Sequence, residues 1–196
     1  MIVKAGTPPP DAEGIAAAAS AASRKGPPPV HLWNPDFCGD IDMEIRRDGS
    51  WFYMGTPIGR PALVRLFASI LKREGENYFL VTPVEKVGIR VQDCPFLAQD
   101  VEATGSGTAQ ELRFTTNVGD TVLAGGENPV EVHRDPETGE PAPKVHIRRD
   151  LWARIDRKTF YRLIDIAVTA PHAGADWLGL WSGGVFFPII PAADLT

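Results

Sequence analysis

The start of a predicted helix carries the residues of this sequence that are best suited to bind an anion. In Gly59-Arg60-Pro61, an arginine occupies the position where a capping serine or aspartate normally precedes a helix. Free backbone amides at a helix N-terminus and a guanidinium can together bind a phosphate or a carboxylate. Trp51 and Tyr53 lie just upstream, and their rings could stack on a planar group. In a second predicted helix, Asp156 supplies an ordinary cap, so we expect a weaker anion-binding site there.

Charge and stacking together predict a ligand-binding site made of Arg60, Trp51, Tyr53, Lys86 and Arg90. The alternative interpretation is that both aromatic side chains belong to the core and that the first arginine pairs with a neighbouring acid. Glu85 and Lys86 are adjacent strand residues that point to opposite faces, so joint catalysis by this pair is not expected.

The sequence contains no phosphate loop, dinucleotide glycine fingerprint, nucleophile elbow or zinc-binding spacing. Asp40, Asp42 and Glu44 share one face of a predicted strand and could bind a hard cation, but alternation alone explains them as its solvated face. Cys38 could be a nucleophile activated by His31, although a buried structural cysteine is commoner. We therefore expect no catalytic residue, no metal and no cofactor.

The composition is that of a folded globular protein: 43% of the 196 residues are hydrophobic and 23% are charged. The formal net charge of −5 gives no reason to expect general binding to nucleic acid or to a membrane surface. The charge is unevenly distributed, because residues 101–140 carry eight acids and two bases, whereas residues 144–162 carry seven bases and two acids. The basic stretch is either an anion-binding surface or simply a solvated face.

The setting expected from the sequence is the cytoplasm. The two cysteines form neither a disulfide framework nor a metal-type spacing. The alanine-rich stretch near the start follows three prolines without a leading basic region, which argues against a signal peptide. The longest apolar runs are too short to span a bilayer.

Periodicity predicts an α+β fold. Asp11 caps a helix through residue 22, and a proline-rich segment follows. Alternation over 41–45, a turn at Asp48-Gly49 and the segment 51–53 predict a hairpin. A helix that begins at Pro61 and stops at Glu74-Gly75 presents Leu63, Leu66, Phe67, Ile70 and Leu71 as one apolar stripe. Further strands are expected at 78–81, 87–91, 96–101, 111–115, 121–123, 130–133 and 145–148.

The first pattern returns in the second half of the chain. Ile45-Arg46-Arg47-Asp48 recurs as Ile147-Arg148-Arg149-Asp150, and each copy is followed by a tryptophan. A second helix then presents Phe160, Leu163, Ile164, Ala167 and Val168, and strands follow at 177–181 and 185–190. We interpret this order as an internal duplication of a strand–strand–helix–strand–strand unit. The expected parts are an N-terminal appendage (1–30), a first unit (31–128) and a second unit (129–196).

The segments 33–35, 38–42, 48–49, 51–53, 57–64 and 78–86 read WNP, CGDID, DG, WFY, PIGRPALV and YFLVTPVEK. In these motifs, and over about residues 30–190, the chain resembles an uncharacterised bacterial family known as domain of unknown function 1285. The resemblance implies a duplicated α+β core whose second half is superficially similar to pleckstrin-homology folds. It also implies a nucleotide-like ligand between the halves and a part in signalling, and it brings no catalytic residues.

The leading hypothesis is therefore a non-catalytic ligand-binding or signalling protein that holds a small anionic, nucleotide-like molecule between its halves. Duplicated units commonly leave a cleft at their boundary, which supports this location. One alternative is a hydrolase that uses carboxylates such as Asp40, Asp42 or Glu85, with or without a metal. The other is a module that binds a protein partner through exposed strand edges.

Overall fold

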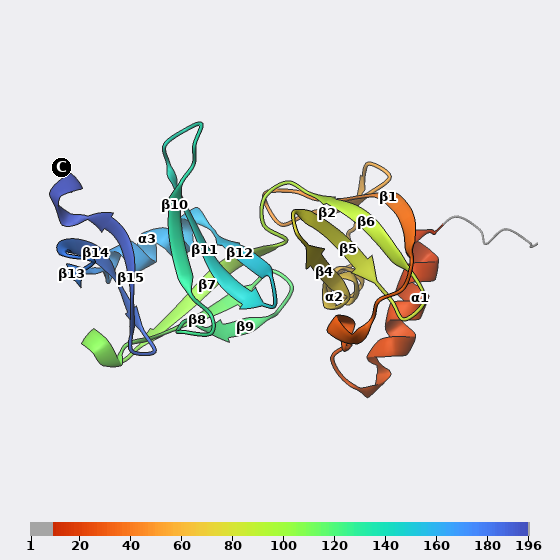
Figure 1. Cartoon of the computed structure of the whole chain (residues 1–196), viewed down its shortest axis with the longest axis horizontal. Helices are drawn as coiled ribbons and strands as arrows, with labels where there is room; N and C mark the ends of the chain where they lie inside the picture. Colours follow the sequence, from red (N-terminus) through yellow and green to blue (C-terminus); the bar gives the residue numbers. More distant parts are fainter. Residues whose placement is uncertain (1–9, 196) are drawn as a thin grey trace, which may run out of the picture. The chain divides into compact units, whose positions relative to one another are not determined.

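The structure is a computed structural model that describes residues 10–195, and the chain forms two compact units, residues 1–92 and 93–196. This division differs from the predicted boundary at 128/129. Strand β7 (Phe96–Thr104) pairs with β12 (Leu151–Ile155), and β8 (Glu111–Thr116) and β9 (Thr121–Leu123) extend the same sheet, so all three belong to the second unit. We predicted the boundary from the position where the sequence pattern repeats. That pattern does not reveal which strands pair, because paired strands are distant in the chain (Figure 1).

The N-terminal unit is built on one six-stranded sheet, sheet A, with the order β3-β2-β1-β6-β5-β4. Its strands are β1 (Phe37–Ile45), β2 (Trp51–Tyr53), β3 (Thr56–Pro57), β4 (Leu71–Glu74), β5 (Asn77–Val81) and β6 (Lys86–Val91). Neighbouring strands are antiparallel except β1 and β6, which run parallel at the centre. The chain enters β1 from the N-terminal helix and returns through β6 beside it, so both central strands contribute residues to the same two faces.

Two helices complete the hydrophobic core beside sheet A. Helix α1 (Ala12–Ala22) begins at Asp11, whose carboxylate accepts a hydrogen bond from Gly14 N, as predicted. It packs on α2 (Pro61–Ser69), and short 3₁₀ turns at Ser23–Lys25 and Val30–Leu32 lead from α1 toward β1. Ile15 and Ala19 are fully buried, so the helix within the predicted appendage is part of the core of this unit, and residues 1–9 of that appendage lie outside the described residues.

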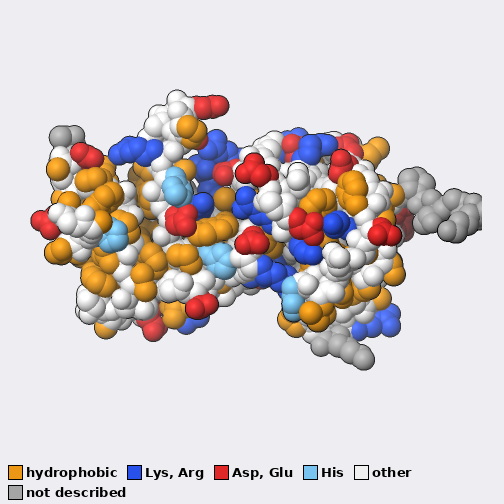
Figure 2. Space-filling view, viewed as in Figure 1, with side chains coloured by type: hydrophobic (Ala, Val, Ile, Leu, Met, Phe, Trp, Pro, Cys, Tyr) orange, Lys and Arg blue, Asp and Glu red, His pale blue; other side chains and the backbone are white. Residues whose placement is uncertain are grey.

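The inner face of sheet A carries the apolar side chains and the outer face the charged ones. Met43, Ile45, Leu80 and Val87 have no exposed surface. The residues that alternate with them in β1 and β6 are polar, and Figure 2 shows acidic and basic side chains interspersed over this region. This is the period-two pattern expected of a sheet covered on one side.

The C-terminal unit contains a six-stranded sheet, sheet B, in the order β10-β11-β12-β7-β8-β9, and a separate three-stranded sheet, β13-β14-β15. The strands are β7 (Phe96–Thr104), β8 (Glu111–Thr116), β9 (Thr121–Leu123), β10 (Val130–Arg134), β11 (Pro141–Arg148), β12 (Leu151–Ile155), β13 (Val168–His172), β14 (Ala175–Ser182) and β15 (Val185–Pro191). Helix α3 (Arg157–Asp165) follows β12 and begins at Asp156, which accepts from Thr159 N. Short 3₁₀ turns lie at Gly107–Ala109 and Ala192–Asp194.

Helices α2 and α3 are shorter than the sequence predicted. Helix α2 ends at Ser69 and Leu71 begins β4, while α3 ends at Asp165 and Val168 begins β13. The apolar stripe misled the prediction, because Phe67, Ile70 and Leu71 are all buried but only the first lies in the helix. Glu74-Gly75 is a strand turn rather than a helix stop, and Gly75 adopts a positive φ of 60° there.

The order of elements does recur. Strand, turn, strand, helix and three antiparallel strands follow one another from β1 to β6, if the two-residue β3 is set aside, and from β11 to β15. The pairing of the final three strands differs, since β6 pairs with β1 whereas β13–β15 form a sheet of their own. Internal duplication therefore remains plausible from the order of elements. The likeness of the second half to pleckstrin-homology folds is not confirmed and stays a prediction.

Candidate functional site

A cavity of about 320 Å³ opens on sheet A of the N-terminal unit, and we call it the sheet A cavity. Its lining comes from three neighbouring strands: β1 gives Phe37 and Asp40, β5 gives Asn77, Tyr78 and Phe79, and β6 gives Lys86, Gly88 and Ile89. One of the five residues predicted to bind a ligand, Lys86, is in this set. The volume lies near the lower end of the range for small-molecule sites.

A glycine on β6 makes room for a carboxylate on β1. Asp40 and Gly88 are register partners on the parallel central strands. A Cβ atom on Gly88 would lie 1.9 Å from Asp40 Oδ1, so the carboxylate occupies the space of the missing side chain. Gly39, at φ +102°, precedes the aspartate at a register shift in β1. Such irregularities re-aim the next side chain, and here they place an exposed hydrogen-bond acceptor at the cavity wall.

Two phenylalanines form the apolar wall. The rings of Phe37 and Phe79 meet edge to face with centroids 6.0 Å apart. Phe37 is 54% exposed, which is high for a phenylalanine, whereas Phe79 is half-buried. An exposed aromatic ring beside a cavity is available to pack on a planar ligand.

Lys86 supplies the cation of the cavity. Its Nζ lies 5.0 Å from the centroid of Phe79 and 2.9 Å from Glu74 Oε2. Lys72 binds the other oxygen of Glu74 at 3.0 Å. Hydrogen bonds from Lys86 and then Lys72 hold the pKa of Glu74 below its usual value, against the opposing effect of burial. Only 16% of the Lys86 side chain is exposed, so its ammonium is fixed at the wall rather than freely solvated.

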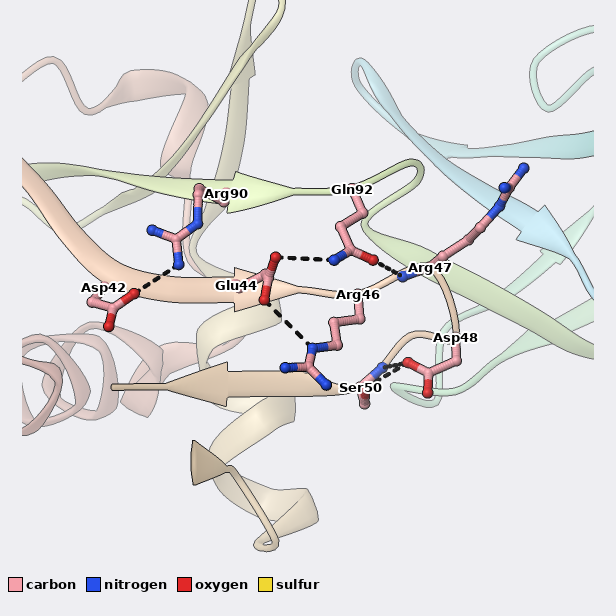
Figure 3. A network of polar contacts seen from close by, with 8 residues as sticks. All are labelled: Asp42, Glu44, Arg46, Arg47, Asp48, Ser50, Arg90 and Gln92. Carbon is pink, nitrogen blue, oxygen red and sulfur yellow. Dashed lines mark hydrogen bonds and ion pairs between the residues drawn. The ribbon is translucent and has the colours of Figure 1, made fainter. Parts of the chain in front are cut away.

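Arg90 lies further along the outer face of β6, in a polar network with β1 (Figure 3). Its guanidinium donates to Asp42 at 2.7 Å, and this hydrogen bond raises the pKa of Arg90. Next along the strands, Gln92 donates to Glu44 at 3.0 Å, and Arg46 approaches the same carboxylate at 3.4 Å. Arg90 is therefore paired with an acid and does not line the sheet A cavity.

The other three predicted ligand residues do not join Lys86. Trp51 is 2% exposed and stacks on Phe67 of α2 at 6.2 Å, so its ring faces are covered by the core. This is the alternative interpretation that the sequence left open. Tyr53, at the end of β2, is half-buried, and Arg60 is exposed before α2 without a side-chain capping bond. Neither residue lines the cavity.

Of the groups considered for catalysis, Asp40 lines the sheet A cavity, whereas the others lie elsewhere or are paired. Asp42 is paired with Arg90. Burial and the charge of Asp11 raise the pKa of Glu85, but this residue is not part of the cavity lining. Cys38 is exposed and donates to Asp36 O at 3.4 Å. The other cysteine, Cys94, was not a catalytic candidate, and burial raises its pKa to about 12, which leaves it a thiol at neutral pH.

Within residues 10–195, no three His, Cys, Asp or Glu side chains gather closely enough to hold a metal ion. The acidic strand face of Asp40, Asp42 and Glu44 is instead divided between the cavity and the ion pairs of the network. None of the helices between residues 10 and 195 is long and apolar enough to cross a membrane.

Sequence reasoning missed most of the cavity wall. Asp40 was assigned to a solvated face and Phe79 to a strand, and neither Phe37 nor Gly88 was singled out. One signal was available: a glycine in the middle of an apolar strand often marks close approach of another group. Which group approaches depends on the pairing of β6 with β1, which lie more than forty residues apart in the chain.

Comparisons with known proteins give one family. Residues 28–94 match the domain described as "Domain of unknown function (DUF1285), N-terminal domain", and residues 95–189 match "Protein of unknown function (DUF1285), C-terminal domain". The junction of the two matches lies beside the boundary between the compact units. No curated protein matches the chain.

Solved structures of DUF1285 family proteins are similar to this chain. One from Silicibacter pomeroyi DSS-3 shares 60% sequence identity, with a TM-score of 0.84 over 93% of this chain and 97% of that chain. One from Shewanella baltica OS155 shares 29% identity, with a TM-score of 0.49 over 63% of this chain and 90% of that chain.

Proposed function

Because the chain belongs to the DUF1285 family, whose description names no activity, we propose a function from its own geometry: it is a non-catalytic ligand-binding protein. The ligand is a small, planar, anionic and nucleotide-like molecule, and the sheet A cavity in the N-terminal unit holds it. The sequence-based hypothesis put such a ligand between the halves. We place it in the N-terminal unit because every residue that lines this cavity belongs there.

The observation that carries the proposal is the carboxylate of Asp40 in the space above Gly88. No other described side chain donates a hydrogen bond to it. An ionised carboxylate accepts hydrogen bonds from paired N–H groups, such as those on the edge of a nucleobase. Asn77, at the same wall, offers both a donor and an acceptor to the edge of such a ring.

The aromatic wall and the cation support the other two features of the ligand. Phe37 is exposed beside the cavity, and stacking of a base on an aromatic ring contributes about 1–3 kcal/mol. Lys86 carries three N–H donors and gives one to Glu74, so donors remain for a phosphate or carboxylate of the ligand. A role in signalling would follow from a nucleotide ligand and belongs to the same proposal.

The alternatives have less support. A hydrolase requires a nucleophile or an activated water beside a base, and the carboxylate with a raised pKa, Glu85, is outside the cavity lining. A protein-interaction module that uses strand edges stays a prediction, as does the metal-dependent hydrolase.

Isothermal titration calorimetry and thermal unfolding with the four ribonucleoside monophosphates, the matching nucleosides and orthophosphate test the proposal. One nucleotide should bind more tightly than its nucleoside, and orthophosphate alone should bind weakly. At a hundredfold excess over the dissociation constant, a bound ligand raises the free energy of unfolding by about 2.7 kcal/mol. A flat response to all nucleotides and nucleosides contradicts the proposal.

Paired variants separate ligand binding from folding. Asp40→Asn should weaken the best ligand about tenfold or more, because a hydrogen bond to a charged group contributes about 1.5–3 kcal/mol. Its control, Glu76→Gln, changes an exposed acid outside the cavity and should leave the affinity unchanged. Lys86→Met should remove the preference for nucleotide over nucleoside, whereas Lys72→Met breaks the other ion pair of Glu74 without touching the cavity lining. Arg60→Ala, which the sequence hypothesis predicted to abolish binding, should now have no effect.

A further inference from the structure

A second, more apolar cavity lies in the C-terminal unit, and we call it the C-terminal cavity. It has a volume of about 270 Å³, opens to the surface and is lined by the β10–β11 hairpin, α3, β14, β15 and Leu195. We propose that it binds the hydrocarbon tail of a small amphiphilic carboxylate, a medium-chain fatty acid, with the carboxylate at Arg134. This site and its ligand are independent of the function proposed for the N-terminal unit.

The wall of the C-terminal cavity suits a hydrocarbon chain. Helix α3 presents Phe160 and Ile164, which lie one turn apart on the same helical face. Leu178 of β14 and Ile190 of β15, a cross-strand pair, face them. All four are only half-buried, so they have apolar surface left to cover. Figure 2 shows hydrophobic side chains gathered over β14 and β15 on this part of the molecule.

The charge at the cavity selects an anion over a cation. Its lining includes two basic residues, His133 and Arg134, and no acid. The ring of His133 is already bonded to Glu131 at 2.8 Å. Arg134 donates to Gly139 O at 3.1 Å across the hairpin, and among the described residues no carboxylate lies within ion-pair distance of its guanidinium. A carboxylate at the mouth of the cavity therefore meets a guanidinium with donors to spare.

The neighbouring cavity limits the length of the tail. A cavity of about 240 Å³ shares Pro141 and Phe160 with the C-terminal cavity. Its remaining wall contains charged pairs, because Arg154 binds Asp93 at 2.6 Å and Arg157 approaches Glu140 at 3.4 Å. A hydrocarbon that extended past Phe160 would reach these charges, and burying charged groups under apolar atoms is unfavourable. We therefore expect affinity to stop rising once the tail fills the C-terminal cavity.

Leu195 gives a position where the cavity can be altered without disturbing the core. It lines the cavity, yet 49% of its surface is exposed, after the 3₁₀ turn Ala192–Asp194. Leu195→Asp puts a carboxylate beside the proposed tail, so it should weaken binding through desolvation and repulsion of the ligand. Val168, 43% exposed in the same unit and absent from the lining, is the matched control, as Val168→Asp.

Calorimetric titration of the full chain with hexanoate, heptanoate and octanoate, each below its micellar concentration, tests the tail. A methylene group contributes about 0.8 kcal/mol when buried, so each should tighten binding about fourfold until the cavity is full. Octanoate should bind more tightly than octanol, and octylamine should bind least. Far-UV circular dichroism and thermal unfolding verify that each variant is folded.

Two arginine variants test whether the carboxylate of the ligand binds to Arg134. Arg134→Gln should weaken the binding of octanoate about tenfold, to the affinity that octanol shows. The affinity for octanol should stay unchanged. Arg113→Gln, at an exposed position on β8, should change neither. The proposal is wrong if octylamine equals octanoate, if affinity does not depend on tail length, or if Val168→Asp weakens binding as much as Leu195→Asp. Binding to vesicles of anionic phospholipid without binding to monomeric octanoate would also overturn it, since the surface would then be a membrane contact.

Discussion

Asp40 and Gly88 occupy one space between them: the carboxylate of the first lies where the second would carry a side chain, with Oδ1 1.9 Å from an ideal Cβ position. The two residues are register partners on β1 and β6. Neither can be enlarged without moving the other, so the chemistry of the sheet A cavity depends on a glycine that itself offers no functional group.

Gly88→Ala should displace the Asp40 carboxylate and abolish ligand binding while the sheet stays folded, because the conflict is with the end of a side chain. We expect a loss of about 1 kcal/mol in the free energy of unfolding. In an Asp40→Ala background the same change should cost little. Urea unfolding of the four proteins in this double-mutant cycle measures the coupling. Equal costs in both backgrounds would show that the two side chains do not compete for space.

A fall in pH should lower the stability of the N-terminal unit through protonation of Glu74. Its pKa is lowered in the folded chain by Lys86 and Lys72, so its contribution is fully present above the unfolded value of about 4.5 and is lost as the pH falls through the folded pKa. Urea unfolding between pH 6 and pH 3 measures this loss. Lys72→Met and Lys86→Met should each flatten the acid limb of the curve. An unchanged slope in both variants would show that the ion pairs do not stabilise the fold.

Ionisation of Glu85 should have the opposite effect and lower the free energy of unfolding. Burial, and then Asp11, raise its pKa in the folded chain, so its charged form opposes folding as the pH rises through that raised value. Glu85→Gln should therefore stabilise the protein at pH 7 by about 0.5 kcal/mol, the lower end of gains from optimised charges. At pH 3.5, where the glutamate is largely protonated in both states, the two proteins should unfold alike. A gain that persists at low pH would point to packing rather than charge.

Ser182 should anchor the three-stranded sheet of the C-terminal unit to sheet B. The buried Ser182 hydroxyl accepts from Leu112 N at 2.8 Å and donates to Ala124 O at 2.7 Å. Ser182→Ala leaves both backbone groups without this partner and should cost about 2 kcal/mol, within the range for an unsatisfied buried polar group. Thermal and urea unfolding measure the loss, with Ser106→Ala, at an exposed position, as the control. A change as small as that of the control would mean that water replaces the hydroxyl.

Local patterns in the sequence were sufficient for elements whose signals are local. The cap at Asp11, the hairpin before Trp51 and the cap at Asp156 were predicted and are found, because each depends on residues within about four positions of one another. The repeated order of elements was likewise visible in the chain. The predicted ends of α2 and α3 were wrong. One apolar stripe can continue from a helix into the next strand when both elements bury the same face.

The two cavities, and the unit boundary, were decided only by tertiary structure. Lys86 was recognised by its charge, but its neighbours Phe37, Asp40 and Gly88 gather around it only because β6 lies parallel to β1. Trp51 was assigned to a ligand by its ring, and the packing of α2 placed it in the core instead. Strand pairing joins residues far apart in the chain, and its energy depends on which faces become buried together. A single sequence specifies those partners through the whole fold and not through any local pattern.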